Sequence, residues 1–143
     1  MGLRYEDDVY GWTREQAFWL RSGRLSEVDA LNLADQLEDM NSIHEYDLSN
    51  RCSCLLAHLA RWKMQEGSRC DLWRRLIDLQ RERIEKMFTA MPRLRSVFSD
   101  QWFLECAWLD TLFKVIGEPS CYDLPDDCPW SLEQALSPDF FPE

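Results

Sequence analysis

The sequence predicts an all-α fold: a compact bundle of about five helices, followed by an irregular acidic C-terminal tail that contains one short helix. Apolar residues recur at intervals of three and four along most of the chain, which is the spacing of one helix face. Hydrophobic residues make up 45% of the 143 positions, too many for a disordered chain. The six prolines gather toward the C-terminus, so long uninterrupted helices are expected before them.

Two helices are expected in the first third of the chain, over residues 5–22 and 26–40. The first ends before Gly23, a residue suited to a helix C-terminus, and a capping box at Thr13 offers it a later start. The second ends at Asn41, which tolerates the left-handed backbone of a C-terminal cap. Its predicted buried face is Val28, Leu31, Ala34, Leu37 and Met40.

The central helix is expected over residues 42–64, because Ser42 and Glu45 form a second capping box at its start. It carries both histidines of the chain, His44 and His58. An amphipathic helix packs through its apolar stripe, so we expect the rest of the bundle to be organised around this one. Its stripe is the densest in the sequence: Leu48, Cys52, Leu55, Leu59 and Trp62.

Two more helices are expected over residues 69–90 and 94–116, separated by Pro92. A short turn near Gly67 makes the helix over 69–90 antiparallel to the central one. Aromatic side chains at helical spacing usually fill a core, and a surplus of them would mark an oligomer interface. The helix over 94–116 has an unusual number: Phe98, Trp102, Phe103, Trp108 and Phe113.

One domain is expected over residues 1–143, with a helical body (1–116) and an acidic tail (117–143) packed on it. A capping box at Ser131 predicts a short helix over 131–136. The predicted anchors of the tail are Phe140 and Phe141.

Charge is unevenly spread along the chain, whose net charge is −10. Residues 61–95 hold ten Lys/Arg against five Asp/Glu, whereas no basic residue follows Lys114. The acidic balance argues against nucleic-acid binding. The basic stretch offers a site for an anion or an acidic partner, but pairing with the acidic rest of the same chain is the favoured account.

The sequence shows no secretory leader. It also has no apolar run approaching the ~20 residues of a membrane span. Both observations predict a cytoplasmic protein with no membrane partner. Reduced cysteines are therefore expected. The redox state of Cys121 and Cys128, in the irregular tail, stays open.

A polar line borders the apolar stripe of the central helix. Folding the chain back near Gly67 brings Gln80, a polar residue in an apolar line, level with Arg51 and His58. Those two are its predicted partners, since an unsatisfied buried amide costs about 1–3 kcal/mol. The line consists of Asp47, Arg51, Cys54, His58 and Arg61.

Metal and covalent chemistry have little support in the sequence. His44 and His58 are 14 residues apart on one helix, about 21 Å, and cannot share an ion. No zinc spacing is present, so no metal and no cofactor are expected. Cys54 and His58 share a helix face, yet an ordinary border cysteine is favoured over a nucleophile, and no catalytic residue is assigned. Asp35, Glu38 and Asp39 offer His58 carboxylates for acid–base work. The favoured account is that they cap and solubilise the helix over 26–40 or pair with arginines of the helix over 69–90.

Four segments together resemble a bacterial family of small helical proteins catalogued as domain of unknown function 29. They are "YEDDVYGWTREQAFWLRSGRLSEVDALNLADQLEDM", "LLAHLARW", "LWRRLIDLQRERIEKM" and "CPWSLEQALSPDFFPE". The resemblance covers nearly the whole chain and implies an all-helical fold, with no activity attached to it. The chain departs from the family at Asn41, where glycine is usual, and in "HLARW" for "HLLKW". The family pattern would include Arg51, His58, Trp62, Trp73, Gln80 and Arg81.

The leading functional hypothesis is a non-enzymatic helical module that acts through protein–protein contacts, with another protein or as a homo-oligomer. Its surface would be the basic helix over 69–90 and the aromatic helix over 94–116. The alternative is a small-ligand or enzymatic pocket. A third option makes the acidic tail the element that masks a basic partner. The candidate binding residues are Arg51, His58, Gln80, Trp62, Trp73, Arg81 and Glu38.

Overall fold

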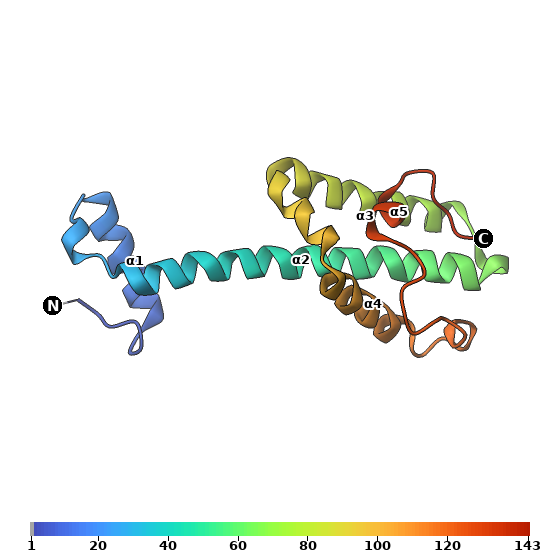
Figure 1. The fold of residues 1–143 in the computed structure, drawn as a ribbon, viewed down its shortest axis with the longest axis horizontal. Coiled ribbons are helices and arrows are strands. Elements are labelled where there is room, and N and C mark those ends of the chain that lie inside the picture. The colour runs from blue at the N-terminus through green and yellow to red at the C-terminus, as the bar shows by residue number, and fades with distance from the viewer. Residues whose placement is uncertain (1) are drawn as a thin grey trace. The chain divides into compact units, whose positions relative to one another are not determined.

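A computed structural model describes residues 2–143, and this part of the chain is helical with no strand (Figure 1). The prediction of an all-α bundle is confirmed. The chain divides into two compact units, Met1–Ile43 and His44–Glu143. The expectation of a single domain stays a prediction. The α-helices are α1 (Val9–Arg21), α2 (Ala30–Met64), α3 (Asp71–Ala90), α4 (Gln101–Val115) and α5 (Leu132–Leu136).

The first unit begins with α1, which starts later than the predicted residue 5. Asp8 caps it, because its carboxylate accepts the backbone N–H of Gly11 at 2.9 Å. Thr13 lies inside the helix and donates its hydroxyl to the carbonyl of Val9, so it is not the cap either. Gly23 has a φ of +71° and ends the helix as predicted.

The predicted break at Asn41 is wrong, because α2 is one helix of 35 residues from Ala30 to Met64. Asn and Ser lower the stability of a helix interior less than glycine or proline does. Cap-like residues at positions 41 and 42 are therefore not enough to end α2. The predicted start at Ser26 is also wrong. A 3₁₀ helix, Leu25–Glu27, comes first, and Asp29 accepts the backbone N–H of Asn32.

The buried face predicted for residues 28–40 is wrong for most of its length. Leu31, Leu37 and Met40 are 83%, 58% and 52% exposed. Helical spacing shows which side chains share a face, but it does not show whether anything covers that face.

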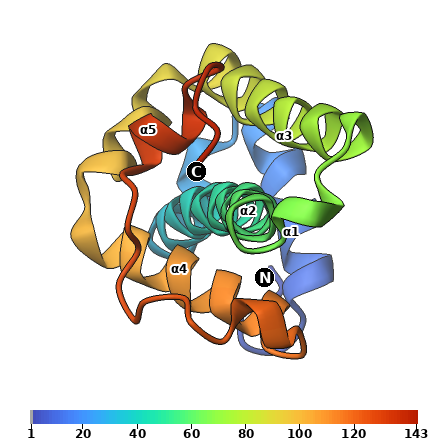
Figure 2. The same cartoon turned by 90° about the vertical axis from the view of Figure 1, so that its right-hand side faces the viewer.

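The second unit is built around the C-terminal half of α2, with α3, α4 and the tail placed about it (Figure 2). Every member of the predicted stripe from Leu48 to Trp62 is buried, as expected. A 3₁₀ helix, Glu66–Ser68, turns the chain from α2 into α3. The core also takes side chains from each of the other helices: Ile77, Ile84, Phe88, Phe103, Trp108 and Leu136.

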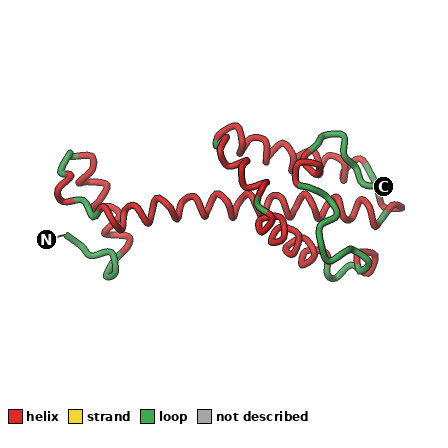
Figure 3. Tube along the Cα trace, in the orientation of Figure 1, coloured by secondary structure: helices red, strands yellow, loops and turns green. Residues whose placement is uncertain are grey.

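The start predicted at residue 94 for the fifth helix is too early. Residues Pro92–Ser99 form a 3₁₀ helix, and α4 begins only after Asp100, whose carboxylate accepts the backbone N–H of Trp102 at 3.0 Å. The tail is mostly loop (Figure 3), apart from a short 3₁₀ turn, Pro119–Cys121, and α5. Ser131 caps α5 by accepting the backbone N–H of Gln134, as predicted. Within the described chain, no helix has the length and apolarity to cross a membrane.

Candidate functional site

A polar pocket of about 400 Å³ lies where α2 and α3 approach the segment after α4. The Glu118 carboxylate accepts hydrogen bonds from Arg61 Nε at 2.9 Å and from Gln65 Nε2 at 2.6 Å. These three polar side chains therefore satisfy one another. The pocket is lined by His58, Arg61, Gln65, Trp73, Leu76 and Glu118.

Two of the predicted binding residues, His58 and Trp73, line this pocket, while Arg51 and Gln80 do not. Arg51 Nε lies 3.5 Å from the carboxylate of Asp47, an ion pair without hydrogen-bond geometry. Gln80 is half-buried, and no hydrogen bond within residues 2–143 joins it to Arg51 or His58. The predicted polar network is not formed, and the binding role of these residues stays a prediction.

His58 makes the stability of the second unit depend on pH. Burial, and then the charge of Arg61, lowers the pKa of His58 below its ordinary value. The unfolded chain then takes up a proton before the folded one, so the unfolding free energy is fully present above about pH 6.5 and falls as the pH drops through the lowered pKa. We expect urea unfolding to show a shallower pH dependence in His58→Gln. Equal slopes for the two proteins would contradict this.

Arg81 of α3 holds the C-terminal tail. Its side chain is buried, and it donates to backbone carbonyls of three tail residues. Nε reaches Ala135 at 3.0 Å, Nη1 reaches Pro138 at 3.2 Å, and Nη2 reaches Phe140. Burial lowers the pKa of Arg81, but a guanidinium stays protonated at neutral pH, so each of these hydrogen bonds is charge-assisted.

Trp62 is the aromatic part of the same anchor. Its ring lies 5.1 Å from that of Phe141, and the guanidinium of Arg69 lies 5.2 Å from the Trp62 ring. Arg74 and Arg81 lie 4.5 and 5.0 Å from the Phe141 ring. Stacked cations and aromatic rings attract. Phe141 therefore anchors the tail, as predicted. Trp62 and Arg81 both contact its ring and so help to hold the tail in place.

The basic stretch of the chain pairs in part with its acidic remainder. Arg61 pairs with Glu118, and Arg95 pairs with Glu133 at 2.8 Å. Arg95 also pairs at 3.6 Å with Glu85, which lies inside the basic stretch. This is the account that the charge distribution favoured. Both arginines lie at the ends of the basic stretch, outside α3, so these pairs leave the charge of α3 itself unchanged.

The outer face of α4 is apolar and exposed. We call this surface the α4 face: Trp102, Leu109 and Phe113 of α4 and the C-cap residue Ile116, which are 65–75% exposed. Its neighbour Cys106 completes a row with steps of four and three residues. The opposite face of α4 is buried in the core through Phe103, Ala107 and Trp108 among others. The sequence identified this helix as aromatic, and the spacing of its outward row was the available signal.

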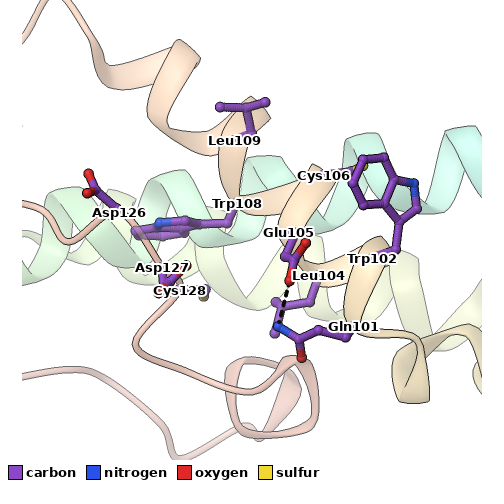
Figure 4. Close-up of a pocket in the computed structure, with 10 residues that line it drawn as sticks. All are labelled: Gln101, Trp102, Leu104, Glu105, Cys106, Trp108, Leu109, Asp126, Asp127 and Cys128. Atoms are coloured by element: carbon purple, nitrogen blue, oxygen red, sulfur yellow. Dashed lines mark hydrogen bonds between the residues drawn. The ribbon is translucent and has the colours of Figure 1, made fainter.

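A pocket of about 320 Å³ opens beside the α4 face, toward the tail (Figure 4). Trp102 stands at one end, and Trp108 and Asp126 stand at the other. Glu105, which accepts a hydrogen bond from Gln101, and the tail residues Asp126 and Asp127 give the pocket a negatively charged rim.

Two thiols of the described chain, those of Cys52 and Cys128, have raised pKa values. Burial raises the pKa of Cys52 to about 12 and that of Cys128 to about 11, so both remain protonated at neutral pH. All six cysteines are free thiols, including Cys121. Among residues 2–143, no three His, Cys, Asp or Glu side chains are grouped to hold a metal ion. Glu38 lies in the first unit and is exposed.

The family model described as Domain of unknown function DUF29 matches residues 4–141. The chain therefore belongs to this family, as its four characteristic segments indicated. No curated protein and no solved structure matches the chain significantly.

Proposed function

We propose that this member of the DUF29 family is a helical protein-binding module that docks a basic amphipathic helix of another protein on its α4 face. The observation that carries the proposal is the exposed row of Trp102, Leu109, Phe113 and Ile116 on a helix whose other side is in the core. A surface helix normally turns its apolar residues to the core and its polar residues to solvent. An apolar patch left open on such a helix is typical of a binding surface.

The shape of the surface favours a helix as the ligand. Helical ligands insert side chains spaced by three, four and seven residues into an apolar groove. Two pockets follow α4 and share Leu109 as a wall: the one beside Trp102 and a second of about 350 Å³ beside Phe113 and Tyr122. Successive anchor side chains of a docked helix have a place in each.

The charge around the surface favours a basic ligand. Glu105, Asp126 and Asp127 line the pocket beside Trp102, and no Lys or Arg follows Lys114 in the chain. Complementary charge raises the association rate and selects among partners. The carboxylates of the tail thus act as a rim around the apolar surface, which gives them a part in binding a basic partner.

A small-ligand or enzymatic pocket beside His58 is the second candidate. The observation in its favour is the 400 Å³ pocket that His58 and Trp73 share. It ranks second because Glu118 already satisfies Arg61 and Gln65 there. A ligand would have to replace those hydrogen bonds, and leaving any of them unmade would cost about 1–3 kcal/mol.

The test of the proposed function uses the full chain and three labelled helical peptides. The peptides share one leucine face and differ in a polar face of lysine, glutamine or glutamate. Fluorescence anisotropy should show the lysine peptide binding at least ~10-fold more tightly than the glutamate peptide, and less tightly as salt is raised. Leu109→Ser with Phe113→Ser should weaken its binding by more than ~10-fold.

The matched control removes two exposed leucines from α3 instead, Leu72→Ser with Leu79→Ser. This variant should bind the lysine peptide as the wild type does. Equal losses in both double variants, or equal affinities for the three peptides, would overturn the proposal.

A further inference from the structure

The first unit buries very little apolar surface of its own. In residues 2–43, the buried side chains are those of Trp12 and Gln16. Large apolar side chains that remain exposed there include Phe18, Leu25, Leu31, Leu37, Met40 and Ile43. A unit of about 40 residues rarely holds its fold without a disulfide, a metal or a partner.

Polar contacts hold α1 to the start of α2 in place of a core. Asp29 accepts the indole N–H of Trp12 at 3.2 Å and donates its backbone N–H to Gln16 at 2.7 Å. Gln36 donates to the hydroxyl of Tyr5 at 2.9 Å. Residues 1–43 contain neither cysteine nor histidine, so a disulfide or a zinc site within this unit is ruled out by composition. A partner that covers the exposed apolar side chains would therefore add stability to this unit.

Two segments of the first unit carry opposite charge: α1 with the turn after it, and the start of α2. Residues 9–26 hold Arg14, Arg21 and Arg24 against Glu15, a balance of +2. Residues 30–43 hold three carboxylates and no Lys or Arg, a balance of −3. No ion pair in the described chain joins these arginines to these carboxylates. Both sets are therefore available to a second molecule.

We propose that a second copy of this chain covers the first unit, with α1 of each copy packed against residues 30–43 of the other. This inference is independent of the α4 face. Direct pairing of the two α2 segments would bring like charges together, which is unfavourable. The reciprocal arrangement places arginines opposite carboxylates twice and closes on itself as a two-fold dimer.

The first unit carries a groove on α1 and an exposed apolar ridge on α2. A groove of about 690 Å³ follows α1, where the small Ala17 and the ring of Phe18 lie between Arg14 and Arg21. Leu37 and Met40 form an exposed apolar ridge on α2 that fits such a groove. The exposed apolar side chains of one unit offer an area on the order of the ~800 Å² that each partner gives to a standard interface.

Paired charge reversals on the full chain test this dimer. One variant carries Arg14→Glu with Arg21→Glu, and the other carries Glu38→Arg with Asp39→Arg. Light scattering should show the wild type at twice the chain mass and each variant alone at the single-chain mass. Mixing the two variants should restore a dimer that contains one of each, because every reversed helix then meets a reversed helix.

Circular dichroism checks that both variants keep the helix content of the wild type, as substitutions of exposed residues should. A wild type that is monomeric up to high micromolar concentration would overturn the proposal. So would a dimer lost in Leu109→Ser with Phe113→Ser instead, an open-ended assembly, or a mixture that fails to associate. A mixture that fails to associate would mean that the first units of two copies do not pair reciprocally.

Discussion

A chain that ends after Cys128 is expected to lose the fold of the second unit. The missing residues include Trp130, Leu132 and Leu136, which belong to the main core, and the anchors Phe140 and Phe141. Burying one large apolar side chain contributes about 1.5–3 kcal/mol, so this loss is on the order of 8 kcal/mol. That is comparable to the whole stability of a typical domain, about 5–15 kcal/mol.

Near-ultraviolet circular dichroism and urea unfolding measure this effect. The truncated chain should show no fixed aromatic signal and no cooperative transition, although some helix content should persist. The matched control keeps the full tail and changes only its charge, by Asp123→Asn, Asp126→Asn and Asp127→Asn. These exposed substitutions should leave unfolding within about 0.5 kcal/mol of the wild type.

The two chains together separate the possible roles of the tail. A truncated chain that still unfolds cooperatively near the wild-type midpoint would show that the tail is dispensable for folding. That result would support the hypothesis that the tail acts mainly through its acidic charge. Loss of folding in the truncation alone makes residues 129–143 part of the core.

The helical pattern predicted the core well where one stripe is buried continuously. Leu48, Leu55 and Leu59 are buried as expected, because a dense stripe on a long helix leaves little choice of packing face. The same pattern failed at Leu37 and Met40. Spacing cannot reveal that these two side chains stay exposed, because exposure is a fact about tertiary structure.

Local capping signals were reliable only where no longer helix competed. Ser131 caps the short α5 as predicted, whereas Ser42 lies in the interior of α2. A capping side chain contributes about 0.5–2 kcal/mol, and an uninterrupted ladder of backbone hydrogen bonds outweighs it. Boundaries that depend on such a balance cannot be fixed from sequence.

The role of Arg81 lay beyond sequence reasoning for another reason. Its acceptors are backbone carbonyls 54 to 59 residues away, and carbonyls are present at every residue. No residue type in the tail therefore marks the contact. The resemblance to the family included Arg81 among the candidate binding residues, and the structure supplies a structural reason for an arginine at that position.

Arg81→Met is expected to destabilise the second unit by about 4 kcal/mol, because hydrogen bonds to a charged group contribute about 1.5–3 kcal/mol each and the carbonyls they leave are partly buried. Arg81→Lys should recover only part of this loss. A lysine supplies a point charge and cannot reach Ala135, Pro138 and Phe140 with the planar geometry of a guanidinium.

Arg83→Met is the matched control, since Arg83 is an exposed arginine on the same helix. It should unfold in urea within about 0.5 kcal/mol of the wild type. Limited proteolysis adds a readout specific to the tail: Arg81→Met should be cut within residues 129–143 sooner than the wild type and Arg83→Met. Were Arg81→Met as stable as Arg83→Met, the buried guanidinium would be repaying only its own desolvation, and the tail would be held by Phe141 and its apolar neighbours alone.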